Sequence, residues 1–220
     1  LEIENLIGYD ALDIEFGYKN GKVHIFQVRP LAGGKKCDAE QEKMIDKTLR
    51  QIHSKIQELN SPHPSLFGKK TLYGIMPDWN PAEMIGIKPR PLSLSFYKEL
   101  ITDNIWAYQR DNYGYKNLRS FPLMVSFAGH PYIDVRVDFN SFIPKTLDDN
   151  LSHKLADFYL DKLSRIPTSH DKVEFDIVFS CYSLDLDLRL QELEKCNFNN
   201  KEIATIRKAL LDLTNNIIKP

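Results

Sequence analysis

Within the first thirty residues of this chain, two segments of alternating apolar and polar residues flank a short turn. The segments cover residues 12–18 and 22–30, and Asn20-Gly21 stands between them. Asn-Gly between two alternating runs is the strongest short-range signal for a β-hairpin, because both residues tolerate the positive φ of a tight turn. The sequence therefore predicts an antiparallel hairpin.

Two registers of this hairpin are compatible with the turn, and they distribute the side chains differently. A two-residue turn at Asn20-Gly21 pairs Glu15 with Phe26 and mixes apolar and charged side chains on both faces. A three-residue loop, with Gly21 in the left-handed conformation, pairs Glu15 with Ile25. A one-residue slip moves a whole strand to the opposite face, so the clean separation of the faces favours the three-residue loop. Its apolar face carries Leu12, Ile14, Phe16, Tyr18, Phe26 and Val28, and its polar face carries Asp13, Glu15, Gln27 and Arg29, with Asp13 opposite Gln27.

The polar face has two interpretations. It can be a solvated surface with cross-strand pairs, each contributing about 0.2–1 kcal/mol. It can also be a site for Mg²⁺ and phosphate, because Mg²⁺ takes carboxylate and amide oxygens and a guanidinium matches phosphate oxygens bidentately. On the residues alone, the solvated surface is the more common of the two.

The hairpin also resembles a motif of a known enzyme family. The strings Asp13-Ile-Glu-Phe16 and Ile25-Phe-Gln-Val-Arg-Pro30, joined by a short glycine turn, are similar to the closing hairpin of the ATP-grasp nucleotide-binding domain in phosphoenolpyruvate synthase, pyruvate phosphate dikinase and rifampicin phosphotransferase. In that family the motif reads approximately Asp-Ile-Glu-Trp/Phe, a turn, then Ile/Leu-Leu-Gln-x-Arg-Pro. The resemblance implies that Glu15 and Gln27 hold the Mg²⁺ of Mg-ATP and that Arg29 contacts a phosphate.

Composition sets wider limits on the class of protein. The chain has 220 residues, of which 42% are hydrophobic and 27% charged, as in a soluble globular protein of one or two domains. A net charge of −1 gives no overall field for nucleic acid or an anionic membrane. No apolar run approaches the ~20 residues of a membrane helix, and the amino terminus has no signal-peptide layout. The three widely spaced cysteines form neither a zinc motif nor a disulfide framework, so a cytoplasmic location is expected.

The resemblance also implies what surrounds this chain. Leu1 stands a few residues before a motif that closes a larger fold, so we expect a piece of a longer enzyme. Such a parent moves a phosphoryl group from ATP through a phosphohistidine to pyruvate or another small-molecule acceptor. The glycine-rich, Ser-His setting of that histidine is not found in this sequence. The partners expected are therefore the remaining ATP-grasp half and the phosphohistidine domain of the parent chain, and the isolated chain is expected to hold neither Mg²⁺ nor ATP and to be inactive.

The expected architecture is α+β, with three parts. Residues 1–34 form the closing hairpin, residues 35–69 a linker helix, and residues 70–220 a mainly helical middle domain that contains a second β-hairpin. Helical periodicity and capping residues predict helices over 38–59, from Asn80, and over 95–113, 148–165, 184–196 and 199–218. Strands are predicted over 71–76 and 173–182, and over 121–127 and 131–139 around the turn Ala128-Gly129-His130.

Three residues of the middle domain are candidates for binding an acceptor. Arg90 lies in a proline-rich stretch, His130 stands at a turn tip beside a glycine, and Arg136 alternates with Asp134 and Asp138. On a strand these last three charges would share one face. The structural alternatives are a solvated loop for Arg90 and mutual pairing of the three charges.

The sequence leaves the role of residues 70–220 open. They can belong to the phosphotransferase, select the acceptor as the middle domain of rifampicin phosphotransferase does, or act as a spacer or homodimerisation domain. Residues 108–119 interleave tyrosines with cations, as single-strand nucleic-acid surfaces do. Because the chain as a whole is nearly neutral, a helix end with half-buried tyrosines is the preferred interpretation, and no nucleic acid or membrane is expected as a partner.

Overall fold

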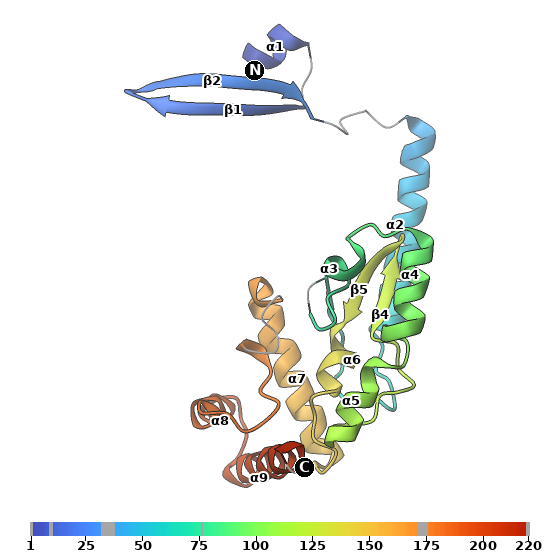
Figure 1. Ribbon diagram of the computed structural model, residues 1–220, viewed down its shortest axis with the longest axis vertical. Coiled ribbons are helices and arrows are strands. Elements are labelled where there is room, and N and C mark those ends of the chain that lie inside the picture. Colours follow the sequence, from blue (N-terminus) through green and yellow to red (C-terminus); the bar gives the residue numbers. More distant parts are fainter. Residues whose placement is uncertain (1, 9–10, 32–37, 76, 171–175, 219–220) are drawn as a thin grey trace. The chain divides into compact units, whose positions relative to one another are not determined.

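The computed structural model describes residues 2–8, 11–31, 38–75, 77–170 and 176–218 (Figure 1). The chain divides into two compact units, Leu1–Arg50 and Gln51–Pro220, called unit 1 and unit 2 below. The described part holds many helices and two small antiparallel sheets, with strand orders β1-β2 and β3-β5-β4. The predicted α+β class and the antiparallel pairing are therefore confirmed.

Unit 1 consists of a short helix, the hairpin and the first turns of a long helix. Helix α1 covers Glu2–Ile7, strand β1 covers Leu12–Lys19, and strand β2 covers Lys22–Pro30. Helix α1 was not predicted from the sequence. The hairpin itself is confirmed.

The turn of this hairpin differs from the predicted one. Lys19 pairs with Lys22, so the turn has two residues, Asn20 and Gly21, with φ of 52° and 77°. Left-handed φ at both positions gives a turn whose twist matches that of the strands. The predicted three-residue loop is wrong, although Gly21 does adopt the positive φ expected of it.

A β-bulge, not the turn length, separates the two faces. Phe16 pairs with Ile25 and Glu15 pairs with Gln27, which leaves Phe26 as an extra residue on β2. The extra residue shifts the side chains that follow it in β2 to the opposite face. Gln27 and Arg29 therefore lie on the same face as Glu15 and Asp13 of β1. The predicted pair of Glu15 with Ile25 is wrong, and a separated pair of faces is nevertheless obtained.

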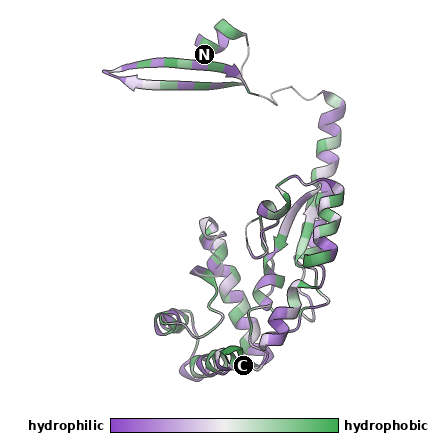
Figure 2. Cartoon of the chain, viewed as in Figure 1, coloured by the Kyte–Doolittle hydropathy of each residue, from purple (hydrophilic) through white to green (hydrophobic). Residues whose placement is uncertain are grey.

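The apolar side of the hairpin is exposed within the described residues. Phe16, Tyr18 and Val23 are 62%, 71% and 58% exposed. Figure 2 shows hydrophobic and hydrophilic residues alternating along β1 and β2. A two-stranded hairpin is marginally stable in water, and further strands or a helix are needed to cover such a face.

Helix α2 covers Ala39–Leu59, as the apolar seam predicts. It begins with a capping box, in which Asp38 Oδ1 accepts hydrogen bonds from the backbone N–H groups of Glu40 and Gln41, and Gln41 Oε1 accepts one from the backbone N–H of Asp38. Its last turns belong to unit 2, where Ile56 is half-buried, whereas Leu49 in unit 1 is 57% exposed.

The sheet of unit 2 contains the second predicted hairpin. Strands β4 (Met124–Phe127) and β5 (His130–Asp134) flank a turn in which Ala128 and Gly129 have φ of 50° and 83°. Strand β3 (Tyr73–Gly74) pairs with the other edge of β5. The predicted strand over 131–139 is wrong beyond Asp134, because the chain there enters helix α6 (Val135–Asn140).

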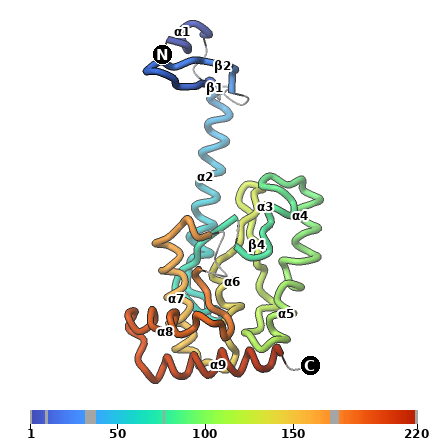
Figure 3. Tube along the Cα trace, turned by 60° about the vertical axis from the view of Figure 1, so that its left-hand side comes forward, coloured from blue at the N-terminus to red at the C-terminus, as the bar shows by residue number. Residues whose placement is uncertain are grey.

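Every residue of α6 is buried, and the helix borders two apolar clusters. Val137 belongs to a cluster with the sheet, Tyr97 and Trp106, and Phe139 belongs to a larger cluster formed with α7, α8 and α9. Figure 3 shows α8 and α9 at the end of unit 2 opposite the β4–β5 turn. A short buried helix therefore joins the two halves of the core.

The other helices follow the predictions with one exception. They are α3 (Pro81–Ile85), α4 (Pro91–Tyr97), a π-helix (Lys98–Thr102), α5 (Trp106–Tyr113), α7 (Asp149–Arg165), a 3₁₀ turn (Pro167–Ser169), α8 (Leu186–Lys195) and α9 (Asn200–Ile218). The single helix predicted over 95–113 is wrong, because α4 already starts at Pro91 and the π-helix separates it from α5. Gly114 ends α5 as expected. Of the strand predicted over 173–182, residues 173–175 lie outside the described residues and 176–182 form no strand.

Candidate functional site

The polar face of the hairpin brings the three predicted phosphate and metal residues together. Glu15 pairs with Gln27 and Asp13 pairs with Arg29 across the strands. The Arg29 Nε donates a hydrogen bond to Asp13 Oδ2 at 2.7 Å, and Arg29 Nη2 lies 3.6 Å from Glu15 Oε1. The guanidinium thus spans both carboxylates on a surface where the three charged side chains are 40–56% exposed.

The donor set of this face fits a hard cation beside a phosphate. Directly paired residues in an antiparallel sheet have Cβ atoms about 4.5–5.5 Å apart, so the Glu15 carboxylate and the Gln27 amide oxygen can reach one ion. Both are oxygen ligands of the kind that Mg²⁺ takes, and Mg²⁺ commonly keeps several waters. Arg29 has five N–H donors, of which Asp13 engages the one on Nε.

Phe26 lies on the polar face and not, as predicted, on the apolar one. A Cβ atom added to Gly17 would lie 2.7 Å from Cζ of the Phe26 ring. Gly17 shares its face of β1 with Asp13 and Glu15, because alternate residues of a strand point the same way. The prediction failed because it placed the extra residue in the turn and not within β2.

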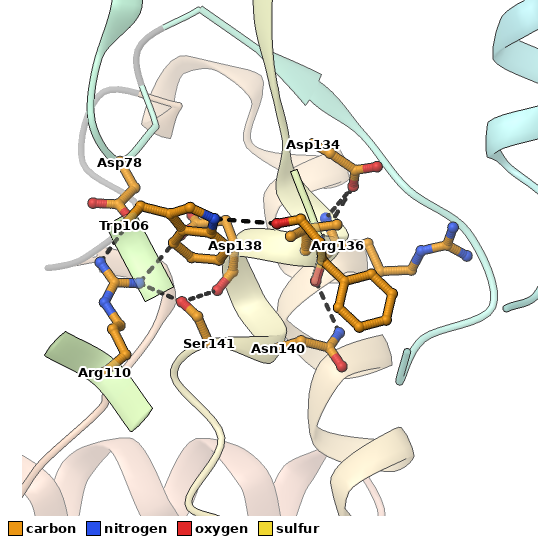
Figure 4. A network of polar contacts seen from close by, with 10 residues as sticks. Asp78, Trp106, Arg110, Asp134, Arg136, Asp138, Asn140 and Ser141 are labelled. Carbon is orange, nitrogen blue, oxygen red and sulfur yellow. Dashed lines mark hydrogen bonds and ion pairs between the residues drawn. The ribbon is translucent and has the colours of Figure 1, made fainter. Parts of the chain in front are cut away.

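A second concentration of polar side chains surrounds helix α6 in unit 2 (Figure 4). Asp134 is the N-cap, and its Oδ1 accepts hydrogen bonds from the backbone N–H groups of Arg136 and Val137 and from Thr71 Oγ at 2.5 Å. Burial raises the pKa of the Asp134 carboxyl above its usual range, while these hydrogen bonds act in the opposite direction.

Arg136 is directed at the end of helix α2. Its guanidinium is nearly fully buried and donates hydrogen bonds to the backbone carbonyls of Leu59 at 2.8 Å and Ser61 at 2.9 Å. The last carbonyls of a helix have no partner within the helix, and a cation there also suits the helix dipole.

Asp138 faces a different element, helix α5. Arg110 of that helix lies 3.5 Å from Asp138 Oδ1 and 2.6 Å from Asp78 Oδ2, and it donates a hydrogen bond to Ser141 Oγ. The same guanidinium stacks 3.9 Å from the centre of the Phe142 ring. The pair of Asp78 and Arg110 was not predicted, because nothing in their separation along the chain relates them.

Helical geometry explains why the charges of α6 do not share a face. Successive residues of an α-helix are rotated by about 100°, so Arg136 and Asp138 point to nearly opposite sides, whereas a strand would align them. Asn140, four residues after Arg136, returns to the first side and bonds both the N–H and the carbonyl of Phe67. The expected shared face of Asp134, Arg136 and Asp138 is therefore wrong.

The other two acceptor candidates lie at the opposite end of β5. The His130 Nδ1 is 3.1 Å from the carbonyl oxygen of Ile87, so His130 contacts the segment that precedes Arg90. Arg90 is exposed and occupies the N-cap position of α4, without a side-chain capping bond. The structure thus places His130 near the loop of Arg90 and places Arg136 beyond the far end of the strand.

Among the described residues, no group of three or more His, Cys, Asp or Glu side chains is arranged to hold a metal ion. In the part of the chain that the structure covers, no helix is both long and apolar enough to span a membrane.

Comparisons with protein-family models, with curated proteins and with solved structures were made for the whole chain. No match was found. The family resemblance therefore rests on the hairpin residues themselves.

Proposed function

We propose that this chain is part of an ATP-dependent phosphotransferase similar to phosphoenolpyruvate synthase, and that its hairpin contributes contacts to the Mg²⁺ and the phosphates of ATP. The observation that carries the proposal is the cross-strand pair of Glu15 and Gln27, with Arg29 beside Glu15 on the same exposed face. A carboxylate, an amide and a guanidinium in one cluster are the groups that a metal–phosphate complex needs.

Each residue has a distinct role in this proposal. Glu15 and Gln27 would hold the metal, Arg29 would bind phosphate oxygens, and Asp13 would orient Arg29 through its bond to Nε. Bound Mg-ATP supplies the phosphoryl group. Phosphoryl transfer depends mainly on positioning and on neutralising charge around the phosphates, which is what these side chains can do.

The proposal also accounts for the exposed apolar side of the hairpin. Phe16, Tyr18 and Val23 would be covered by the rest of the ATP-grasp domain, which belongs with the phosphohistidine domain to the same longer chain. Two strands supply too few contacts to bind a nucleotide by themselves.

The isolated chain is accordingly expected to show no measurable affinity for Mg-ATP. Association costs an estimated ~4–15 kcal/mol, which the few phosphate contacts of one hairpin cannot offset. Isothermal calorimetry with Mg-ATP tests this expectation. Micromolar binding by the isolated 220-residue chain would contradict it.

The proposed role is tested by ATP-dependent labelling of a longer chain that carries the ATP-grasp half and the phosphohistidine. We expect Arg29→Ala to slow labelling by about 10³-fold or more, as loss of a phosphate-binding arginine does elsewhere. Glu15→Ala should be comparably damaging, while the thermal stability of both variants changes little, because surface substitutions usually stay within about ±0.5 kcal/mol.

Two further variants calibrate this experiment. Lys22 is exposed and lies at the turn end of β2, the strand that carries Arg29. Lys22→Ala should therefore label at the wild-type rate. The labelling rate of Asp13→Ala should lie between that of Lys22→Ala and those of Glu15→Ala and Arg29→Ala, because this substitution frees the Arg29 side chain without removing it. Labelling of Glu15→Ala and Arg29→Ala at near wild-type rates would show that the polar face is only a solvated surface.

A second function, acceptor binding by unit 2, is favoured by one cleft. It has a volume of about 600 Å³ and runs along α7 beside the end of α8. Such a volume suits a small molecule. Its carboxylates are each paired with a lysine, whereas Arg165 and Lys195 have no carboxylate partner among the described residues.

The cleft would therefore take a small organic anion, although Arg90, His130 and Arg136 do not line it. Titration with pyruvate and with inorganic phosphate, followed by NMR shifts of Phe158 and Phe198, tests this. Arg165→Ala should abolish the shifts and Arg90→Ala should leave them. Shifts that persist in Arg165→Ala, or that are absent in the wild type, would remove this second function.

A further inference from the structure

The hairpin contains one irregularity, and it lies next to the proposed metal ligands. Toward the turn, Phe16 pairs with Ile25, and away from the turn, Glu15 pairs with Gln27. The ladder changes register between these two pairs, with Phe26 as the extra residue.

The bulge determines which residue of β2 lies opposite Glu15. A ladder continued without a bulge from the two-residue turn would place Glu15 opposite Phe26 and Gln27 opposite Ile14. The Gln27 amide would then lie on the apolar face, away from Glu15. The bulge is therefore what makes Gln27 the neighbour of Glu15.

Gly17 supplies the space that the extra residue needs. A Cβ atom at Gly17 would approach Cζ and Cε2 of Phe26 to 2.7 and 2.9 Å, closer than real Cβ atoms come to neighbouring atoms. Gly17 is not among the residues with positive φ, so a missing side chain, and not backbone freedom, is what this position provides. It is the only glycine within β1.

An aromatic ring over a strand glycine is a known means of fixing a register. Glycine weakens a strand because it has no side chain to pack, and a neighbouring aromatic ring can compensate by covering it. At every other position of β1 the ring would meet a side chain already there. The contact between Phe26 and Gly17 thus selects where the extra residue goes.

We propose that Gly17 and Phe26 are positioning residues, whose contact fixes the bulge at Phe26 and thereby holds Gln27 opposite Glu15. This inference rests on the proposed function for its purpose, since the pair it aligns is the proposed pair of metal ligands. The register itself can be measured without ATP or metal.

The experiment is NMR of the 220-residue chain, with the cross-strand backbone contact between Glu15 and Gln27 as the readout. The wild type should show this contact. Gly17→Val fills the space of the ring, and Phe26→Ala removes the ring, so both should lose the contact. Tyr18→Val, at the next position of β1 and on the other face, is the matched control and should keep it.

Deletion of Phe26 separates register from stability. Removing the extra residue leaves an unbulged ladder in which Gln27 is again opposite Glu15, so this variant should show the contact between Glu15 and Gln27. Gly17→Val combined with the deletion should show it too, even if Gly17→Val alone unfolds the hairpin. A purely structural role would lower the melting temperature and leave the register unchanged.

The proposal is overturned if Gly17→Val and Phe26→Ala both retain the contact of Glu15 with Gln27, or if the deletion variants lack it. This result is independent of the labelling experiment. If labelling shows Glu15 to be dispensable, the proposed function fails while the measured register still decides the role of Gly17 and Phe26.

Discussion

At the scale of single residues, the two candidate arginines of unit 2 differ most in what surrounds them. Arg136 is nearly fully buried and bonded to two backbone carbonyls, whereas Arg90 is exposed. A guanidinium in the first situation holds the end of a helix, and one in the second is free to meet a ligand.

Arg136→Ala is therefore expected to lower the free energy of unfolding of unit 2 by at least about 2 kcal/mol, because hydrogen bonds to a charged donor contribute about 1.5–3 kcal/mol each. Arg90→Ala should change it by less than about 0.5 kcal/mol. Urea unfolding of the two variants measures the difference. Equal, small effects would show that the carbonyl contacts of Arg136 do not stabilise the fold.

The buried carboxyl group of Asp134 is expected to make the stability of the fold depend on pH. Because burial raises its pKa in the folded state, the folded protein binds its proton more tightly than the unfolded chain does. The stability contributed by the protonated form is complete below the unfolded pKa and is lost as the pH rises through the folded pKa. Asp134→Asn lacks this titration while keeping an oxygen for the cap.

The free energy of unfolding of Asp134→Asn, minus that of the wild type, should therefore become more positive as the pH rises from 4 upward. Thermal melts of both proteins in one buffer series give this difference, and other carboxyl groups cancel from it. A difference that falls with pH would mean that the hydrogen bonds from Thr71 and the helix N-terminus outweigh burial.

At the scale of elements, local sequence patterns predicted most helices and both hairpins. The helix starts predicted at residues 38 and 148 are confirmed, and the structure shows that the side chains of Asp38 and Asp148 cap them. The four polar residues of the hairpin's polar face were also predicted, although a bulge in β2, and not the predicted three-residue loop, brings them together. Helix α6 was not predicted, since charged and apolar residues alternate through it as in a strand.

Helix α6 and the bulge in β2 depend on tertiary contacts. Asp134 can cap a helix only because Thr71 and the buried surroundings fix it there, and Arg136 and Asp138 each find a partner on another element. The bulge at Phe26 likewise depends on space across the strand at Gly17. Neither contact is visible in the spacing of residues along the chain.

The turn of the second hairpin offers a test of element stability. Ala128 adopts a φ of 50°, which costs an ordinary residue roughly 1–2 kcal/mol relative to the right-handed region. Ala128→Asn gives the Asn-Gly sequence favoured in such turns and should raise the melting temperature of unit 2. Gly129→Ala should lower it. A lower melting temperature for Ala128→Asn would contradict the turn geometry.

At the scale of the whole molecule, the chain combines two units of different character. Unit 2 has a large buried core, whereas unit 1 presents a hairpin with one exposed apolar face and one polar face. This division agrees with a chain whose first unit completes a nucleotide site formed elsewhere, and whose second unit folds around its own core.

If Glu15 and Gln27 bind one metal ion, as proposed, their substitutions are coupled, and a double-mutant cycle measures this coupling. Rates of ATP-dependent labelling are measured in the longer chain for Glu15→Ala, Gln27→Ala and the double variant. Residues that serve as one unit are strongly non-additive, so the double variant should label about as slowly as the slower single variant. Effects that multiply, or single variants that label like the wild type, would contradict a shared metal site on the hairpin.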